Sequence, residues 1–453
     1  MKNVSISLKM LSVALVLSVG VANAQVKDSS LTSPTSTTVP TPVTVVTPTP
    51  EPKKDVFVPG GKLWGQVFMD YYYVAHQDSL GRGTGQYSNG GKTPITGEYA
   101  KNRNELQYRR IYIGYNYDIA PKFSAELLLS SEKDVPGGDV SGTGAGGAGI
   151  GSLTQFIKYA NIRWKGIFPG SDVVVGQMAT PAFATSSEPV WGYRSVEKTI
   201  ADFRGTNSYD LGISLQGKFD PKKGNYGYNV MFGNGTKAAP ADTVKSTNPG
   251  TFKTIYADVY AKFLNKKLIV DLYSDYTLTF RRPGTPTTSS FEQSRNMVKL
   301  MVGYTDKRFA VGVEGFITNL SNQMNATGTA KVDTLSPIAT GLSIFARGSI
   351  TSWLNIFARW DGFNPNNSIN NGKYSAYNSG GFANSAGGGY TVAGFAKESF
   401  ISAGLDFTPN KNVHIIPNIW YNSFASQAKN AAGDAKKDNT TVYRITFAYT
   451  FGK

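Results

Sequence analysis

The sequence predicts an all-β protein: a closed, transmembrane antiparallel β-barrel of about sixteen strands with short periplasmic turns and long external loops. Three observations lead to this prediction. Apolar and polar residues alternate with a period of two from Lys62 to the C-terminus, connections alternate between short and long, and aromatic residues gather beside the short connections.

The N-terminal part predicts export and a spacer. Residues 1–24 have the form of a signal peptide, because a basic start and an apolar run precede the small residues of Ala22–Ala24. That run is shorter than the roughly 18 apolar residues of a membrane-spanning helix, and no later stretch approaches that length. Residues 25–61 are rich in Pro and Thr without apolar periodicity, which predicts a disordered periplasmic tether. Residues 62–453 form the predicted barrel.

Composition excludes several classes of function. The chain has no cysteine, so it forms neither disulfides nor thiolate metal sites, and its two histidines leave little for metal binding or acid-base chemistry. We therefore expect no cofactor and no metal. The formal charge is +15, and removal of two signal-peptide lysines gives 15 − 2 = +13 for the mature chain. This charge indicates a basic surface, and an exported chain rich in Gly and Tyr does not suit nucleic-acid binding.

The alternation predicts sixteen strands, at Leu63–His76, Glu105–Tyr117, Phe123–Ser131, Gln155–Lys165, Asp172–Met178, Tyr209–Phe219, Asn225–Phe232, Thr254–Phe263, Leu268–Phe280, Met297–Thr305, Phe309–Thr318, Gly341–Ile350, Leu354–Asp361, Glu398–Phe407, Val413–Phe424 and Thr441–Phe451. In the last of these, apolar side chains such as Ile445 and Phe447 share one face, whereas Arg444 and Thr446 share the other. A chain that ends on such a strand needs a fixed partner, and the first strand of a closed barrel provides one.

The connections predict which rim faces the periplasm. Short turns stand at 118–122, 166–171, 220–224, 265–267, 306–308, 351–353 and 408–412, and most contain Asp, Asn, Gly, Pro or Lys. Long connections stand at 77–104, 132–154, 179–208, 233–253, 281–296, 319–340, 362–397 and 425–440. Short turns on one rim and long loops on the other are typical of an outer-membrane barrel.

The two faces of the strands predict lipid outside and water inside. Aromatic residues on the apolar face flank the short turns, as expected of an interfacial girdle: Tyr117, Phe123, Trp164, Phe219, Tyr226, Phe263, Tyr304, Phe309 and Phe407. The opposite face is charged, and unpaired burial of those charges would cost several kcal/mol each, so we expect a water-filled interior. Its basic members form the predicted pore wall: Arg110, Arg163, Lys299, Arg347, Arg359 and Arg444.

Four motifs give the barrel region a family resemblance: RRIYIGY at 109–115, GQMATPAF at 176–183, YRSVEKT at 193–199 and YDLGISLQGKF at 209–219. In their order along the chain, they resemble the outer-membrane porins related to the phosphate-selective porins O and P. The resemblance implies a homotrimer in which the third long loop, residues 179–208, folds inward and sets the constriction. Carried over by position, the constriction consists of Glu188, Arg194, Glu197, Lys198, Asp202 and Arg204.

The resemblance implies passive diffusion of small hydrophilic solutes through a Gram-negative outer membrane. Arginine side chains favour anions, because the guanidinium fork fits phosphate and carboxylate oxygens. The alternative is that many of these charges pair with each other across the loop. Acidic residues lie between the lumen arginines, and no continuous arginine ladder can be traced. We therefore expect a general porin with a mild anion preference. Its possible solutes include phosphate and other oxyanions.

Two other functions fit an exported barrel. A hydrolase would need His76 or His414 as its base, and His414 is predicted to face water beside a short turn instead of a lipid substrate. We therefore expect no enzymatic activity. An adhesin or receptor would use the loop 362–397, whose Gly, Asn and Ser content suits a flexible cap better than a binding surface.

Overall fold

The computed structural model describes residues 57–78, 101–102, 104–132, 155–204, 207–235, 253–282, 291–321, 323–324, 334–367, 382–383, 389–390, 396–426 and 437–452. The predicted signal peptide and nearly all of the predicted tether lie outside these residues, as does most of the loop 362–397. The described residues include most of the predicted barrel.

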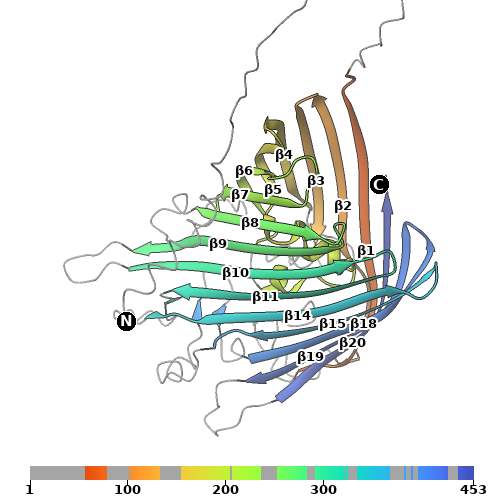
Figure 1. The fold of residues 1–453 in the computed structure, drawn as a ribbon. Coiled ribbons are helices and arrows are strands. Elements are labelled where there is room, and N and C mark those ends of the chain that lie inside the picture. The colour runs from red at the N-terminus through yellow and green to blue at the C-terminus, as the bar shows by residue number, and fades with distance from the viewer. Residues whose placement is uncertain are drawn as a thin grey trace, which may run out of the picture. The chain divides into compact units, whose positions relative to one another are not determined.

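Sixteen strands close into a single barrel, which confirms the predicted fold class (Figure 1). Sequential strands pair antiparallel, and β1 (Gly60–His76) closes the ring against β20 (Lys437–Phe451). The remaining barrel strands are β2 (Asn104–Ala120), β3 (Phe123–Glu132), β4 (Gln155–Phe168), β5 (Ser171–Ala179), β6 (Tyr209–Lys218), β7 (Tyr226–Gly233), β8 (Thr254–Phe263), β9 (Leu268–Arg282), β10 (Phe291–Thr305), β11 (Phe309–Ser321), β14 (Ile338–Ser349), β15 (Leu354–Asn364), β18 (Ala396–Asn410) and β19 (Val413–Ser426).

The outer face of the barrel is apolar, and the inner face carries the charges. On β11, Val311 and Val313 point outward and are 43% and 45% exposed, whereas Ala310 and Glu314 point inward and are 0% exposed. An apolar belt of this kind is stable in lipid and unfavourable in water. The chain is therefore a transmembrane barrel. In the part of the chain that the structure describes, no helix is long and apolar enough to span a membrane.

Aromatic rings meet one another beside the short turns, where the sequence predicts an interfacial girdle. The ring centroids of Phe123 and Trp164 lie 5.7 Å apart, and those of Tyr304 and Phe309 lie 5.4 Å apart. Phe123, Trp164 and Phe309 are all more than one third exposed on the outer surface. Their amphipathic or flat rings suit the boundary between lipid and water at the periplasmic rim.

Several strands extend beyond the predicted bounds at their external ends. β10 begins at Phe291 instead of Met297, and β20 begins at Lys437 instead of Thr441. Backbone pairing continues there, for example between Glu292 and Arg281. A hydrogen-bonded ladder needs no apolar face once it rises above the lipid, so the sequence pattern ends before the strand does.

Two short hairpins outside the barrel sheet were not predicted. One pairs β12 (Gln323–Met324) with β13 (Thr334–Leu335), and the other pairs β16 (Phe382–Ala383) with β17 (Gly389–Tyr390). Strands of two residues are too short to show a period of two, which explains why the sequence pattern does not reveal them.

Candidate functional site at the pore constriction

The connection from β5 to β6, the third loop, holds three short helices: α2 (Pro181–Ala184), α3 (Ser187–Trp191) and α4 (Ile200–Arg204). Pro181 opens α2, where its missing N–H removes no helical hydrogen bond. Gly192 ends α3 with a φ of 72°, and its N–H donates to the Glu188 carbonyl at 2.9 Å. Helices this short show no apolar periodicity, so the sequence did not predict them.

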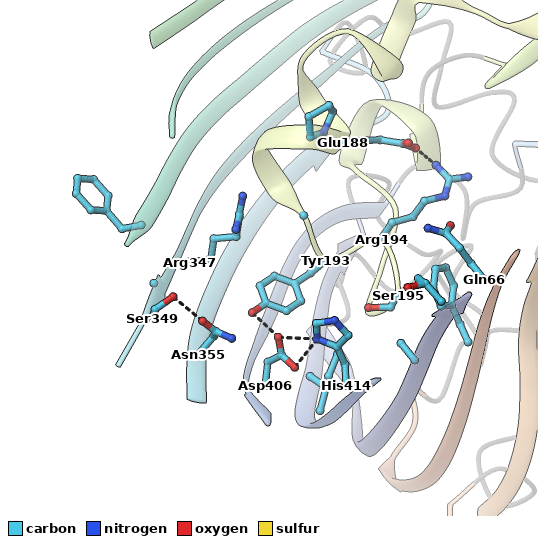
Figure 2. Close-up of a pocket in the computed structure, with 18 of the residues that line it drawn as sticks. Gln66, Glu188, Tyr193, Arg194, Ser195, Arg347, Ser349, Asn355, Asp406 and His414 are labelled. Atoms are coloured by element: carbon cyan, nitrogen blue, oxygen red, sulfur yellow. Dashed lines mark hydrogen bonds and ion pairs between the residues drawn. The ribbon is translucent and has the colours of Figure 1, made fainter. Parts of the chain in front are cut away.

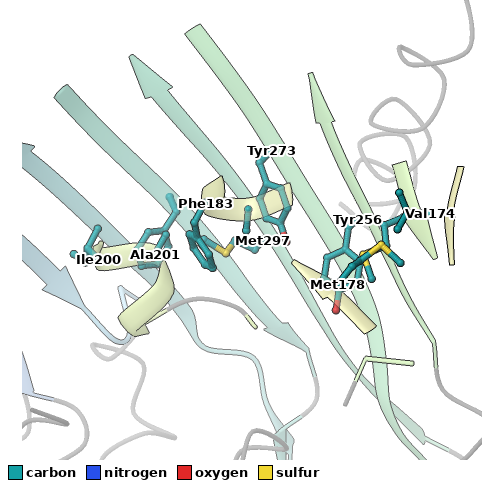
Figure 3. Close-up of a cluster of buried hydrophobic side chains, with 11 residues drawn as sticks. Val174, Met178, Phe183, Ile200, Ala201, Tyr256, Tyr273 and Met297 are labelled. Atoms are coloured by element: carbon teal, nitrogen blue, oxygen red, sulfur yellow. The ribbon is translucent and has the colours of Figure 1, made fainter. Parts of the chain in front are cut away.

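Apolar side chains fasten α2 and α4 to the inner wall (Figure 3). Phe183 of α2 and Ile200 and Ala201 of α4 belong to one buried cluster with Tyr273 of β9 and Met297 of β10, each at most 2% exposed. Burial of one such Phe or Ile side chain stabilises by about 1.5–3 kcal/mol. The third loop therefore fills part of the lumen with packed side chains, so only the rest of the lumen can hold the expected water.

Trp191 at the end of α3 is the centre of a second buried cluster. It is 0% exposed and meets Phe345 of β14 and Phe357 of β15 edge to face, at centroid distances of 5.3 and 5.8 Å. Tyr193 packs on Phe357 at 4.3 Å. Trp191 Nε1 donates to the Glu197 carbonyl at 2.9 Å, which satisfies its buried polar atom. This cluster holds the middle of the third loop against the wall.

Arginines of the wall bind backbone carbonyls of the third loop. Arg109 Nη1 donates to the carbonyls of Ser195 and Val196 at 2.8 and 2.6 Å. Arg444 Nη2 donates to the same Val196 carbonyl at 2.9 Å, and Arg110 Nη1 donates to the Arg194 carbonyl at 2.9 Å. Because charged donors make the stronger class of hydrogen bond, these three guanidinium groups pin residues 194–196.

Two further arginines bind the loop on either side of this stretch. Arg347 Nε donates to the Val190 carbonyl at 3.0 Å, and Arg359 Nη1 donates to the Lys198 carbonyl at 2.5 Å. We call the five wall residues the arginine anchors: Arg109, Arg110, Arg347, Arg359 and Arg444. All but Arg347 are at most 3% exposed. The contacts of these arginines position the loop. The same guanidinium groups also contribute positive charge to the lumen.

Acidic partners balance the arginine anchors beside the loop. Asp70 lies 3.2 Å from Arg109 Nε and 3.7 Å from Arg444 Nη1, and its other oxygen accepts a hydrogen bond from Thr446 at 2.6 Å. Glu197 of the loop lies 3.8 Å from Arg109 Nη2 and 3.9 Å from Arg110 Nη2. Buried charges are tolerated when they are paired, and each of these groups has an ion pair and at least one hydrogen bond, although some of their buried atoms, such as Asp70 Oδ2 and Arg109 Nε, make ion pairs alone.

Two β-bulges bring residues inward that the alternation rule misassigns. Between β1 and β2 the register skips Arg109, so both Arg109 and Arg110 are buried inside. Between β3 and β4 it skips Lys158, which is 2% exposed and binds Glu132. The sequence prediction therefore omitted Arg109 and Lys158, and it placed Glu132 in an external loop. Consecutive basic residues in RRIYIGY were the only available signal for the first bulge.

Strands β8, β10 and β11 form the acidic wall, where the loop meets acidic side chains. Glu314 of β11 accepts a hydrogen bond from the Ala201 N–H at 3.2 Å and a shorter one from the Ser187 hydroxyl. Lys299 Nζ donates to Ser187 Oγ at 2.9 Å and lies 3.7 Å from Glu314. Thr185 donates to Asp258 at 3.2 Å. The third loop thus lies between a basic wall and an acidic wall, with polar contacts to both.

Two cavities meet beside the third loop. The larger, about 570 Å³, opens toward the short-turn rim, and the smaller, about 130 Å³, lies between the loop and strands β1 to β4. Four residues line both: Gln66, Ala184, Glu188 and Arg194. Figure 2 shows Glu188 and Arg194 joined by an ion pair on the loop, with Gln66 across from them. This junction is the candidate constriction.

The predicted constriction residues differ in where their side chains lie. Glu188 and Arg194 lie at the junction, with side chains 25% and 19% exposed, and Arg194 Nη1 also lies 3.3 Å from Asp202. Glu197 is 5% exposed beside the loop among the arginine anchors, and the Lys198 N–H donates to it at 2.7 Å. Arg204 ends α4, and its side chain lies outside the described part of the structure.

The predicted wall residues also lie in different surroundings. Arg110, Arg359 and Arg444 serve as arginine anchors, and Lys299 is 0% exposed within the acidic wall. Arg163 lies apart from the loop, 35% exposed, and pairs with Asp172 at 3.0 Å near the short-turn rim. Arg347 is both an anchor and a lining residue of the larger cavity. The geometry brings Arg194 and Arg347 to open space and covers most of the others.

His414 belongs to a hydrogen-bonded chain in the larger cavity (Figure 2). Its Nδ1 lies 3.0 Å from Asp406, and Tyr193 of the loop donates to the same carboxylate at 3.1 Å. Burial and the nearby Asp406 carboxylate raise the pKa of Tyr193, so its hydroxyl remains a donor. The third member of this chain is thus a tyrosine that ties the loop to the wall, and not a serine nucleophile.

Among the described residues, no group of three His, Asp or Glu side chains is arranged to hold a metal ion.

Comparison with known proteins supports the fold. No protein-family model matches the sequence, and no curated protein matches it. Solved structures do match: the outer-membrane channel DcaP of Acinetobacter baumannii has a TM-score of 0.53 at 12% identity, covering 87% of this chain and 97% of its own. The anion-selective porin from Comamonas acidovorans has a TM-score of 0.52 at 13% identity, covering 87% of this chain and 100% of its own.

At such low identity these likenesses establish the fold alone. The chain is a sixteen-stranded outer-membrane barrel with the architecture of porins, and its lumen holds a docked third loop.

Proposed function

We propose that this chain is an outer-membrane porin that lets small hydrophilic solutes diffuse passively through its lumen. The observation that carries the proposal is the meeting of two cavities at Glu188 and Arg194, inside a closed barrel and beside a loop fixed to both walls. A loop fixed in this way holds the width of the path constant, which suits a permanently open channel. No turnover chemistry is part of the proposal.

We propose a mild preference for anions. The lining of the larger cavity carries four side chains with permanent positive charge and three acidic ones, a small positive excess: Arg194, Lys307, Arg308 and Arg347 against Glu188, Asp306 and Asp406. A low-dielectric wall strengthens such a field and lowers the barrier for a partly dehydrated anion.

The sequence resemblance to the phosphate-selective porins O and P supports a homotrimer and extends the possible solutes to phosphate and other oxyanions. Phosphate specificity is not part of the proposal, because the guanidinium groups of Arg110, Arg359 and Arg444 already donate hydrogen bonds to loop carbonyls. By the same reasoning from sequence, we propose that residues 1–24 direct export and that residues 25–61 form a periplasmic tether.

Reconstitution of the full-length exported protein in a planar bilayer with a salt gradient tests the proposal. We expect ohmic channels whose reversal potential shows weak anion preference. Arg194→Gln leaves Glu188 and Asp202 without their cation and should shift the reversal potential toward cations. Arg163→Gln, whose partner Asp172 lies away from both cavities, is the matched control and should change it less.

Absence of channels from protein that shows barrel-type, heat-modifiable mobility would overturn the porin proposal. A cation-preferring wild type would overturn only the assigned polarity.

A further inference from the structure

Aromatic side chains line the barrel wall beside the charged pair of the constriction. We call Trp64, Phe68, Tyr112 and Tyr159 the aromatic track. Phe68 and Tyr112 are 6% and 4% exposed and meet edge to face at 6.1 Å, forming a buried base. Trp64 and Tyr159 are half-buried and pack against this base. Three of the four, Trp64, Tyr112 and Tyr159, line the smaller cavity.

The Trp64 ring is held flat against the wall. It covers Gly114 of the neighbouring strand, where an added Cβ would lie only 2.2–2.6 Å from three indole atoms. Glycine at this position lets the ring lie directly on the backbone. One face of the indole is therefore covered by β2, and the ring borders the cavity as a flat platform.

Tyr112 is also fixed in place, in this case by polar contacts. Its hydroxyl donates to Glu132 at 2.8 Å, and Lys158 Nζ lies 5.1 Å from its ring centroid. Because Lys158 is itself paired with Glu132, neither charge is available as a strong partner for a passing solute. The track therefore offers mainly ring surface, fixed before any solute arrives, which lowers the entropy lost on contact.

Arg194 supplies the charge at the edge of the same cavity. Its contacts to Glu188 and Asp202 both run through Nη1, one of three guanidinium nitrogens. Arg194 also lies within hydrogen-bond reach of the Tyr112 hydroxyl, and a carboxylate that enters the cavity can accept a charged hydrogen bond from a guanidinium nitrogen outside the two ion pairs. The cavity between Arg194 and the aromatic track is about 130 Å³, close to the roughly 150 Å³ of an apolar cavity that accommodates benzene.

We propose that the constriction is a passage site for aromatic carboxylates, whose ring lies on Trp64 and Tyr159 while the carboxylate meets Arg194. This inference rests on the proposed porin function and names its solute class. A small inorganic anion uses only the arginine, and a neutral sugar uses only the rings. An aromatic carboxylate uses both, so it stays longest at the constriction.

The experiment measures current interruptions in single channels of the full-length protein, with sodium benzoate or sodium acetate added to one side. We expect benzoate to interrupt the current for longer than acetate. Trp64→Leu and Tyr159→Leu keep apolar bulk without an aromatic face, and each should shorten the benzoate interruptions about two- to tenfold. Trp353→Leu is the control, since Trp353 stacks on Phe407 outside both cavities.

Equal interruptions by benzoate and acetate would overturn the inference, as would benzoate interruptions unchanged in Tyr159→Leu. Interruptions by glucose as long as those by benzoate would show that the charge is not used, and would overturn it too. If Trp64→Leu fails to fold, the Tyr159→Leu variant and the benzoate–acetate comparison in the wild type decide. A wild type without conductance would instead refute the porin function itself.

Discussion

Replacing Arg109 by Met should loosen the third loop. The substitution removes two charged hydrogen bonds, to Ser195 and Val196, and the 3.2 Å pairing with Asp70. Breaking a fully buried pair costs about 3–5 kcal/mol when one charge is left without a partner, and here the lower end applies because Asp70 keeps Arg444 at 3.7 Å. If about 3 kcal/mol of this is lost from loop docking, the detached population rises roughly 150-fold, since every 1.4 kcal/mol is tenfold.

Single-channel recording is the assay, because a loop that detaches changes the width of the path. We expect Arg109→Met channels to show larger current fluctuations and a less uniform unit conductance. Arg347→Met removes one loop bond from a less buried anchor and should give a smaller effect in a variant that folds more readily. Arg163→Met, an arginine paired with Asp172 away from the loop, is the control.

Heat-modifiable gel mobility would first establish that each barrel has formed. Arg109→Met and Arg347→Met channels as quiet as those of Arg163→Met would refute the anchoring role of the wall arginines.

Three further predictions concern stability. Trp191→Ala removes a fully buried ring from three aromatic contacts and should cost about 3–5 kcal/mol, so the denaturant midpoint falls; an unchanged midpoint would contradict the packing described. Gly176→Ala places a Cβ 2.3 Å from a β4 carbonyl oxygen at a φ of +125° and should lower the refolding yield, whereas Gly315→Ala, with neighbours at 3.7 Å, should not. Ile213→Lys, in the middle of β6 on the outer face, should lower the free energy of unfolding in lipid vesicles by about 2–4 kcal/mol. Ile350→Lys, at the short-turn rim, should lower it by only about 0–1 kcal/mol. Equal losses in the two variants would argue against this placement in the membrane.

The constriction was only partly predictable from the sequence. The inward position of Arg444 follows from simple alternation along the last strand, but its bond to the Val196 carbonyl joins residues 248 positions apart. Arg109 and Lys158 escaped the alternation rule because each lies at a bulge, where one extra residue shifts the faces. No local pattern marks these positions.

What the sequence determined by itself is the closed barrel and its orientation. A period of two is a property of neighbouring residues, and the regular exchange of short and long connections is visible without any long-range contact. What only the tertiary structure decided is the content of the lumen. Whether a charged wall residue meets water or a loop carbonyl depends on where residues 180–204 dock, and that position results from buried apolar contacts and charged hydrogen bonds with strands distant in the chain.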